Sequence, residues 1–267
     1  MLDIVKSPAN APPPMALKRV VKTYGAGGAN SPVVLDGIDL TIADGEIVAI
    51  LGQSGCGKST LLRIIAGLVP ASHGEVLYRG RPVTEPMPGI AMVFQSFALF
   101  PWMTVLENVS FGLEAQGVGA SERRKRAVKA IDLIGLDGYE NDYPKELSGG
   151  MRQRVGFARG LVVHPQLLLM DEPFGALDEI VRDKLNEQLL RLWERTQKTV
   201  VFVTHSIPEA VFLSTKIVVM SPRPGRIHDV IDCNFPADRT LDIRETPEFI
   251  AVANRVRHGL REGHSYD

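Results

Sequence analysis

One glycine-rich segment of the 267-residue chain has the residue types and spacing of a phosphate-binding loop. Residues 52–59 read GQSGCGKS and fit the P-loop pattern G-x-x-x-x-G-K-S/T. Glycines let the backbone curl so that its N–H groups point inward around phosphate oxygens, and a helix that starts here adds positive potential. Lys58 is expected to reach the β- and γ-phosphates, and the Ser59 hydroxyl to ligate Mg²⁺. The predicted nucleotide contacts of this segment are Gly52, Ser54, Gly55, Cys56, Gly57, Lys58, Ser59 and Thr60.

The alternative for this segment is a glycine-rich turn that binds nothing. Its context argues against that alternative, because an apolar strand precedes the loop and a helical segment follows it. Cys56 lies within the loop, and its simplest interpretation is a small filler whose side chain points away from the phosphates. No base that would activate a catalytic thiol is evident near Cys56 in the sequence.

A pair of acids, Asp171 and Glu172, would complete a site for nucleotide hydrolysis. They follow the apolar run Leu167–Met170, which places them at the carboxyl edge of a sheet, where open α/β folds bind ligands. Asp171 is expected to hold the Mg²⁺ shell, and Glu172 to orient or deprotonate the attacking water. Two acids in a strand-end turn are the alternative, which the phosphate-binding loop in the same chain makes less attractive.

These residues need a sheet and helices to bring them together, and the sequence pattern predicts both. Apolar runs bounded by turn residues predict strands over residues 16–23, 33–42, 46–51, 90–94, 167–170, 200–203 and 217–220. Helical spacing is expected over residues 58–66, 104–135, 179–195, 207–213 and 246–263. Strands that alternate with helices indicate a largely parallel sheet covered on both faces. The helical middle third interrupts this alternation, and we interpret it as an inserted subdomain.

A second candidate anion site lies at residues 147–154, LSGGMRQR, where a serine hydroxyl and glycine amides lead into a helix. A helix N-cap at Ser148 and nothing more is the alternative for this segment. The eight-residue string resembles the signature motif of ABC ATPases. The chain therefore has two phosphate-binding helix starts but one set of lysine and Mg²⁺ ligands.

Other segments carry the same resemblance in the expected order. Gln95 resembles the Q-loop glutamine that contacts Mg²⁺ and water, and residues 173–178, PFGALD, resemble the D-loop. His205 resembles the switch histidine that senses the γ-phosphate, and Tyr24 the aromatic residue that stacks on adenine. Packing without a function is the alternative for both. The resemblance implies catalytic roles for Lys58, Gln95, Glu172 and His205, Mg²⁺ ligation by Ser59, Gln95 and Asp171, and ATP contacts by Tyr24, Ser148, Gly149, Gly150 and Asp178.

The resemblance covers about residues 16–232 and implies an α/β fold, the P-loop NTPase fold of ABC type. That fold has a mixed-sheet core, an antiparallel β subdomain and an inserted helical subdomain, here at about residues 96–160. The ATPase domain is expected over residues 16–235, after a disordered Pro/Ala-rich tail (1–15) and before a C-terminal helical extension (236–267). The resemblance also implies ATP and Mg²⁺, and a head-to-tail homodimer. Each ATP would lie between the P-loop of one subunit and Ser148 and Gly150 of the other.

Two further segments indicate which branch of the family the chain resembles. Residues 93–105, VFQSFALFPWMTV, resemble the region of bacterial importer ATPases that receives a coupling helix of the permease, with Phe97, Phe100 and Trp102 divided between groove and core. Residues 221–227, SPRPGRI, with the final helix, are similar to the nitrate, sulfonate and taurine import subfamily. The resemblance implies transmembrane permease partners and, indirectly, an extracytoplasmic solute-binding protein. The run 205–210, HSIPEA, departs from the family, which often has Asp-x-x-Glu-Ala after the histidine.

Bulk composition bears on the remaining alternatives. The formal net charge of −1 gives no whole-chain basic field for nucleic acid, although a soluble ABC ATPase acting on nucleic acid or ribosomes stays open as the second hypothesis. A P-loop kinase is disfavoured, because a hydrolytic Glu172 makes little sense where water must be excluded. The longest apolar runs fall far short of the ~20 residues of a membrane span, and the first residues lack a signal-peptide pattern. We therefore expect a peripheral protein on the cytoplasmic face of the inner (plasma) membrane, held there by partner chains.

Overall fold

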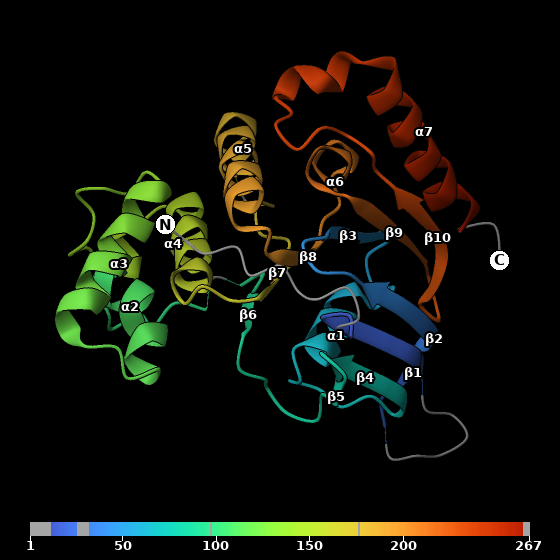
Figure 1. Ribbon diagram of the computed structural model, residues 1–267, viewed down its shortest axis with the longest axis horizontal. Coiled ribbons are helices and arrows are strands. Elements are labelled where there is room, and N and C mark those ends of the chain that lie inside the picture. Colours follow the sequence, from blue (N-terminus) through green and yellow to red (C-terminus); the bar gives the residue numbers. More distant parts are fainter. Residues whose placement is uncertain (1–11, 26–31, 97, 176, 264–267) are drawn as a thin grey trace.

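The computed structural model describes residues 12–25, 32–96, 98–175 and 177–263 (Figure 1). The predicted tail therefore lies mostly outside the described residues, as do Phe97, Ala176 and most of the turn between the first two predicted strands. Within the described part, a central sheet is flanked by a second sheet and by two groups of helices.

The central sheet has six strands in the order β10-β9-β3-β8-β7-β6. The strands from β9 to β6 run parallel, and β10 is antiparallel to β9, so the predicted mixed-sheet core is confirmed. The sequence pattern did not predict β10, an edge strand in which four of the seven residues are polar or charged. The six strands are β3 (Ile47–Gly52), β6 (Ile90–Val93), β7 (Leu167–Asp171), β8 (Thr199–Val203), β9 (Lys216–Ser221) and β10 (Arg226–Asp232).

The second sheet is antiparallel and confirms the predicted antiparallel β subdomain. Its strand order is β2-β1-β4-β5, built from β1 (Met15–Thr23), β2 (Val33–Ile42), β4 (His73–Tyr78) and β5 (Arg81–Pro82). Neither β4 nor β5 was predicted. β4 begins with the exposed residues His73, Gly74 and Glu75, and β5 has two residues, so neither shows the apolar periodicity of a strand.

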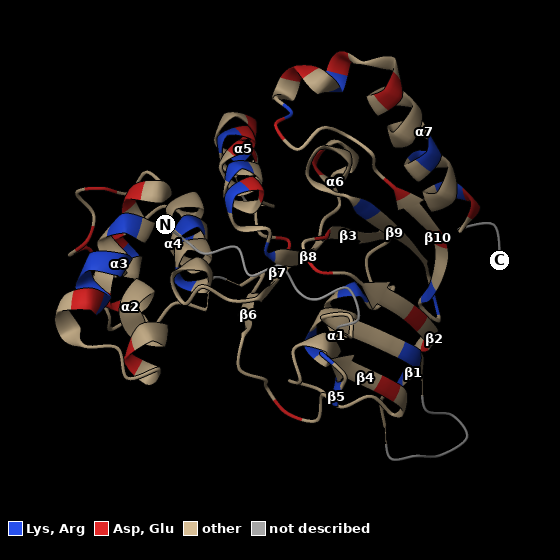
Figure 2. Ribbon diagram, viewed as in Figure 1, with Lys and Arg blue, Asp and Glu red and all other residues tan. Residues whose placement is uncertain are grey.

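A group of helices between β6 and β7 forms the inserted helical subdomain. It contains α2 (Val105–Ala115), α3 (Ala120–Leu133), the short 3₁₀-helix η1 (Pro144–Glu146) and α4 (Gly149–Val162). The single helical stretch predicted over residues 104–135 is in fact two helices, because Gly117 turns the chain in a left-handed conformation with φ 75°. Figure 2 shows that α3 is rich in Lys and Arg.

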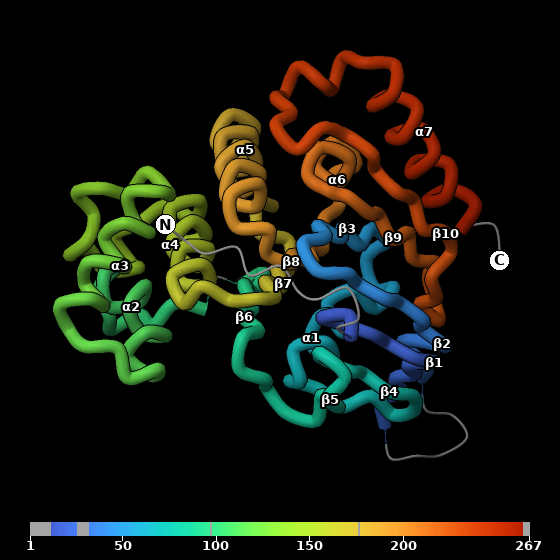
Figure 3. The backbone as a smooth tube through the Cα atoms, in the orientation of Figure 1, coloured from blue at the N-terminus to red at the C-terminus, as the bar shows by residue number. Residues whose placement is uncertain are grey.

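Two apolar cores cover the two faces of the central sheet, as the alternation within β3 illustrates. Ile47, Ala49 and Leu51 belong to the core shared with α4, α5 (Glu179–Thr196) and α6 (Ile207–Leu213). Val48 and Ile50 face the other core, shared with α1 (Lys58–Ile65) and the antiparallel sheet. Figure 3 shows these layers, with α1 and the antiparallel sheet on one side of the central sheet and α5 and α6 on the other. Because successive strand residues point to opposite faces, an apolar run such as this one is buried throughout.

The C-terminal segment packs against the side of the central sheet that α5 and α6 cover. It forms the 3₁₀-helix η2 (Leu241–Glu245) and α7 (Pro247–Glu262), which confirms the predicted final helix and lies against α6 and β9. The buried Arg239 guanidinium donates hydrogen bonds to the carbonyls of Phe212 and Leu213 at 2.5 and 2.9 Å. Arg244 forms a bidentate ion pair with Asp183 of α5, with N···O distances of 2.6 and 2.9 Å. Among the described residues, no helix has the combined length and apolarity that crossing a membrane requires.

Candidate active site

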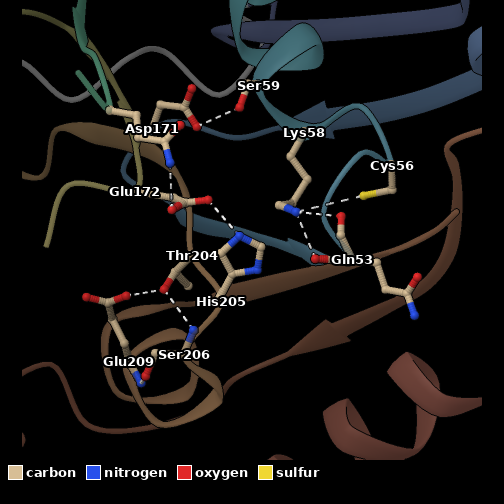
Figure 4. Close-up of polar contacts among 12 residues, drawn as sticks. Gln53, Cys56, Lys58, Ser59, Asp171, Glu172, Thr204, His205, Ser206 and Glu209 are labelled. Carbon is tan, nitrogen blue, oxygen red and sulfur yellow. Dashed lines mark hydrogen bonds and ion pairs between the residues drawn. The ribbon is translucent and has the colours of Figure 1, made fainter. Parts of the chain in front are cut away.

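Adjacent parallel strands end at one edge of the central sheet, and the candidate residues follow them there. β3 leads into the P-loop, β8 is followed by His205, and β7 ends at Asp171 with Glu172 next. β6, beside β7, is followed two residues later by Gln95. The carboxyl ends of parallel strands meet at the same edge, so residues far apart in the sequence gather in one place (Figure 4).

The P-loop joins β3 to α1 through a backbone that needs glycine. Gly55 and Gly57 have φ 83° and 95°, in the left-handed region that other residues adopt at a cost. A Cβ atom on Gly57 would also lie 2.6 Å from Cδ2 of Leu35. Gly57 is the N-cap of α1, so the first free N–H groups of that helix face the loop.

Lys58, the first residue of α1, directs its side chain back across the loop. Its Nζ atom donates to the carbonyls of Gly52 and Gln53, both at 2.8 Å. The Nζ atom lies 4.0 Å from Sγ of Cys56, whose side chain is fully buried. A Cβ atom on Gly52 would lie 2.6 Å from that sulfur, so Cys56 fills the space beneath the loop. Burial raises the pKa of the Cys56 thiol.

Ser59 and Asp171 place two oxygen atoms side by side. The Ser59 hydroxyl donates to Oδ1 of Asp171 at 3.0 Å. Burial raises the pKa of Asp171, whereas the hydrogen bond from Ser59 opposes that rise. A hydroxyl and a carboxylate in contact are the kind of oxygen ligands that Mg²⁺ prefers. The chemistry of this pair therefore fits the predicted metal position.

Glu172 lies at the centre of the site and is held there by three residues. Its Oε1 lies 2.6 Å from Nε2 of His205, and its Oε2 accepts a hydrogen bond from Gln95 at 3.0 Å. Its backbone carbonyl accepts a hydrogen bond from Gln153 of α4 at 3.0 Å. Glu172 has φ 49°, a left-handed conformation that costs a non-glycine residue about 1–2 kcal/mol. The surrounding contacts stabilise that conformation and fix the direction of the carboxylate.

A hydrogen-bonded turn carries His205, and sequence reasoning missed its contact between Thr204 and Glu209. The Thr204 hydroxyl donates to Oε2 of Glu209 and accepts from the backbone N–H of Ser206 at 3.0 Å. The Ser206 hydroxyl in turn caps α6 by accepting from the N–H of Glu209 at 3.3 Å. Glu209 is 4 % exposed, and burial raises its pKa. The sequence signals were Ser206, whose side chain can cap a following helix as it does here, and the acid in the HSIPEA run, whose burial no spacing rule reveals.

Arg182 forms hydrogen bonds to the D-loop that sequence reasoning missed. Arg182 of α5 donates to the carbonyls of Phe174 and Leu177 at 3.3 and 2.8 Å. Asp178 caps α5, because its carboxylate accepts from the N–H of Val181 at 3.0 Å. A cavity of about 330 Å³ lies between the D-loop and the turn that carries His205. Its lining residues include Arg182, Glu172, His205 and Glu209.

Two groups of predicted residues stand apart from this cluster. Ser148 is the N-cap of α4, where its hydroxyl accepts from the N–H of Met151 at 3.2 Å, with Gly149 and Gly150 in the first turn. Tyr24 is 42 % exposed, with Nζ of Lys22 5.0 Å from its ring centre. Over the described ranges of the chain, neither Ser148 nor Tyr24 makes a hydrogen bond to Lys58, Asp171 or Glu172.

Comparison with known proteins identifies the family. The family model described as ABC transporter matches residues 35–175, which include the P-loop, the SGG segment and both acids. This chain belongs to the ABC transporter family. The nitrate import ATP-binding protein of Synechocystis sp. is 45% identical over 241 residues, covering 88% of this chain and 91% of that protein. The taurine import ATP-binding protein of Rhizobium johnstonii is 46% identical over 228 residues, covering 84% and 87%.

A solved structure of the ABC family supports the same assignment. The ATP-binding cassette MJ0796, a dimer bound to ADP and Pi in a post-hydrolysis state, has a TM-score of 0.77 and 35% identity. The alignment covers 83% of this chain and 100% of that one. The predicted ABC-type fold is thereby confirmed. The chain is an ABC ATPase, an enzyme whose ATP hydrolysis is coupled to transport.

Proposed function

We propose that this chain is the ATP-hydrolysing subunit of a bacterial importer for a small anionic solute such as nitrate, taurine or an alkanesulfonate. The observation that carries the proposal is the level of similarity to two import ATP-binding proteins, 45% and 46% over more than four-fifths of this chain. A soluble ABC ATPase acting on nucleic acid or ribosomes has no such support.

Each residue of the strand-edge cluster has a place in the proposed hydrolysis. The P-loop amides and Lys58 would bind the β- and γ-phosphates. Ser59, Asp171 and Gln95 would hold Mg²⁺, which supplies charge neutralisation for phosphoryl transfer. Glu172 would orient the attacking water and accept its proton, as the pair of contacts to Gln95 and His205 fixes the carboxylate within the site. Tyr24 would stack on adenine.

A second copy of the chain would complete each site. Ser148, Gly149 and Gly150 begin a helix in the inserted helical subdomain, and their N–H groups can bind an anion. They would contact the nucleotide held by the P-loop of the partner subunit, with Asp178 of the D-loop at the same interface. The dimeric ATP-binding cassette that this chain resembles supports this arrangement.

An aromatic surface beside α2 fits the proposed permease partner. Trp102 is 69 % exposed, and its ring centre lies 5.7 Å from that of Phe100. Phe100 also contacts Phe111 of α2 at 4.7 Å between ring centres. Exposed aromatic clusters are typical of interfaces. A permease helix bound here would hold the protein at the cytoplasmic face of the membrane, with the extracytoplasmic solute-binding protein on the other side.

The proposal is tested by growth of a bacterial strain that lacks this chain. The strain would be grown on single nitrogen or sulfur sources: nitrate, ammonium, taurine, an alkanesulfonate and sulfate. We expect a selective loss of growth on one of nitrate, taurine or the alkanesulfonate, with recovery when the gene is restored. Normal growth on all five sources would contradict the proposed solute class. Purification without any membrane-spanning partner would favour the soluble alternative instead.

A further inference from the structure

A cavity on this molecule lies away from the ATP site. It has a volume of about 560 Å³ and lies where α3 and the end of α4 meet α5 and the strands β7 and β8. Its walls include side chains from both the helical subdomain and the core. It shares no lining residue with the cluster around Lys58 and Glu172.

The floor of this cavity is apolar. The side chains of Leu161, Leu189, Leu192 and Trp193 contribute to it, together with Leu133 at the more exposed end. The Nε1 atom of Trp193 donates to the Gly45 carbonyl at 2.6 Å, so the indole is held in place and its polar atom is already satisfied. A ligand at this floor would therefore meet hydrocarbon and the side of an aromatic ring.

Basic groups surround this apolar floor. Arg126, Lys129 and Lys198 line the cavity with a single acid, Glu122, which pairs with Arg126 at 2.8 Å. Within the described part of the chain, neither Lys129 nor Lys198 makes an ion pair or a side-chain hydrogen bond. His164 lies among these groups, and its pKa is lowered by burial and also by the charges of Arg126 and Lys198. The polar part of the cavity thus has an excess of positive charge.

We propose that this cavity is a binding site for a small amphipathic anion. The ligand would have an apolar body of up to about eight carbon atoms, resting against Trp193 and Leu192, and one acidic head between Lys129 and Lys198. The volume falls within the range of about 300–1,000 Å³ of small-molecule sites, and an apolar wall with a few convergent polar groups is the usual composition of such sites. The head is a carboxylate, a sulfonate or a phosphate, because each offers several acceptors to ammonium donors.

The placement of the cavity would let a bound ligand contact two structural elements at once. A ligand there would touch α3 of the helical subdomain and α5, which follows the D-loop directly. It would bind the arrangement of these two elements seen here better than one in which they have moved apart. Such differential affinity is what allows a ligand to shift a conformational equilibrium.

Trp193 permits a direct binding measurement. The chain has two tryptophans, so Trp102→Phe leaves Trp193 as the single fluorescent indole. In this background, without nucleotide, octane-1-sulfonate would be titrated while Trp193 emission is followed. We expect a saturable change in emission, and no saturable change with octyltrimethylammonium, which has the same tail and the opposite charge. No saturable response to the sulfonate, or equal responses to both probes, would overturn the proposal.

A pair of double variants separates the cavity from general charge effects. Lys129→Gln/Lys198→Gln removes two positive charges from the cavity, and Lys125→Gln/Lys184→Gln removes two from exposed positions on the same helix α3 and on α5. The first pair should weaken octane-1-sulfonate binding about tenfold or more, the value of a charge-assisted hydrogen bond. The second pair should leave the affinity within about twofold. Equal weakening by both pairs would contradict a site in this cavity.

Discussion

Nε2 of His205 lies 2.6 Å from Oε1 of Glu172, and this contact joins the ends of two neighbouring strands. Gln95 binds the other carboxylate oxygen at 3.0 Å, so the acid is held from both sides. A carboxylate fixed in this way cannot rotate freely away from a nucleotide bound at the P-loop. The orientation of the carboxylate is therefore set by the two side chains that contact it, Gln95 and His205.

The change Glu172→Gln should separate binding from hydrolysis. The amide retains the size and much of the hydrogen bonding of the acid but cannot accept a proton from water, so turnover should fall by about 10²–10⁴-fold. ATP affinity should change little, and ATP should trap a dimer that gel filtration detects. Glu194→Gln, an exposed change on α5, is the matched control and should leave turnover unchanged. Near-normal turnover of Glu172→Gln would refute the proposed base.

The change Lys58→Ala should weaken ATP binding. Removal of one charge-assisted phosphate contact costs about 1.5–3 kcal/mol, which corresponds to a loss of about 10–100-fold in affinity. Isothermal titration calorimetry with ATP and Mg²⁺ measures this directly. Lys184→Ala on the exposed face of α5 serves as the control. Unchanged ATP affinity would mean that Lys58 does not contact the phosphates.

A mixing experiment tests whether Ser148 acts across a dimer. Neither Ser148→Arg nor Lys58→Ala alone should form a working site. A mixed dimer, however, contains one site with an intact lysine from one subunit and an intact serine from the other. We therefore expect partial ATPase activity in the mixture, at most half of the wild-type value for the same concentration of mixed dimers. Full activity, or none despite proven mixed dimers, would contradict action in trans.

Glu209 should make stability depend on pH. Burial raises its pKa above the ordinary value of 4.5, so the folded protein binds this proton more tightly than the unfolded chain does. The stability contributed by that proton is complete below 4.5 and is lost as the pH rises through the folded pKa. Because Glu209→Gln has no proton to lose, its melting temperature relative to wild type should rise across this window.

The control for this measurement is Glu194→Gln, an exposed acid whose difference from wild type should stay flat. Thermal unfolding followed by circular dichroism at several pH values gives both differences. A constant difference for Glu209→Gln would show that Glu209 titrates alike in the folded and unfolded chains.

Both thiols of the chain should resist alkylation in the folded protein. Cys56 and Cys233 are buried, and burial raises the pKa of both, that of Cys233 to about 12. Because the thiolate is the reactive form, iodoacetamide at about pH 8 should modify neither thiol in the native protein and both in urea. Mass spectrometry counts the adducts. Rapid native labelling of Cys56 would contradict its placement beneath the P-loop.

The sequence predicted the residues of the site better than the residues that hold them in place through hydrogen bonds. Lys58, Asp171, Glu172 and His205 could be found because each follows an apolar strand, and parallel strands end at one edge. The structure brings these residues to one edge of the sheet, where Glu172 contacts His205 and Asp171 contacts Ser59, although their catalytic roles remain predictions. Thr204, Glu209 and Arg182 were missed because their value lies in buried hydrogen bonds between turns, and such contacts have no fixed spacing along the chain.

The strands also divide into those that the sequence predicted and those that it did not. Strands with continuous apolar runs, such as β3 and β7, were predicted to within about a residue or two, because both faces are buried. The edge strand β10 and the short strands β4 and β5 were not, since pairing with a neighbour, rather than their own composition, makes them strands. The break between α2 and α3 depends on the left-handed Gly117, and helical spacing continues on either side of it.

Arg239 places a limit on how this protein can be shortened or fused. Its guanidinium satisfies the last carbonyls of α6, the helix that begins directly after the turn bearing His205. A chain cut at residue 235, where the motifs suggest that the catalytic unit ends, would lose that partner and leave these carbonyls without it. The segment that contains Arg239 is therefore needed to support the end of α6. An engineer who grafts another module onto this cassette should attach it beyond α7.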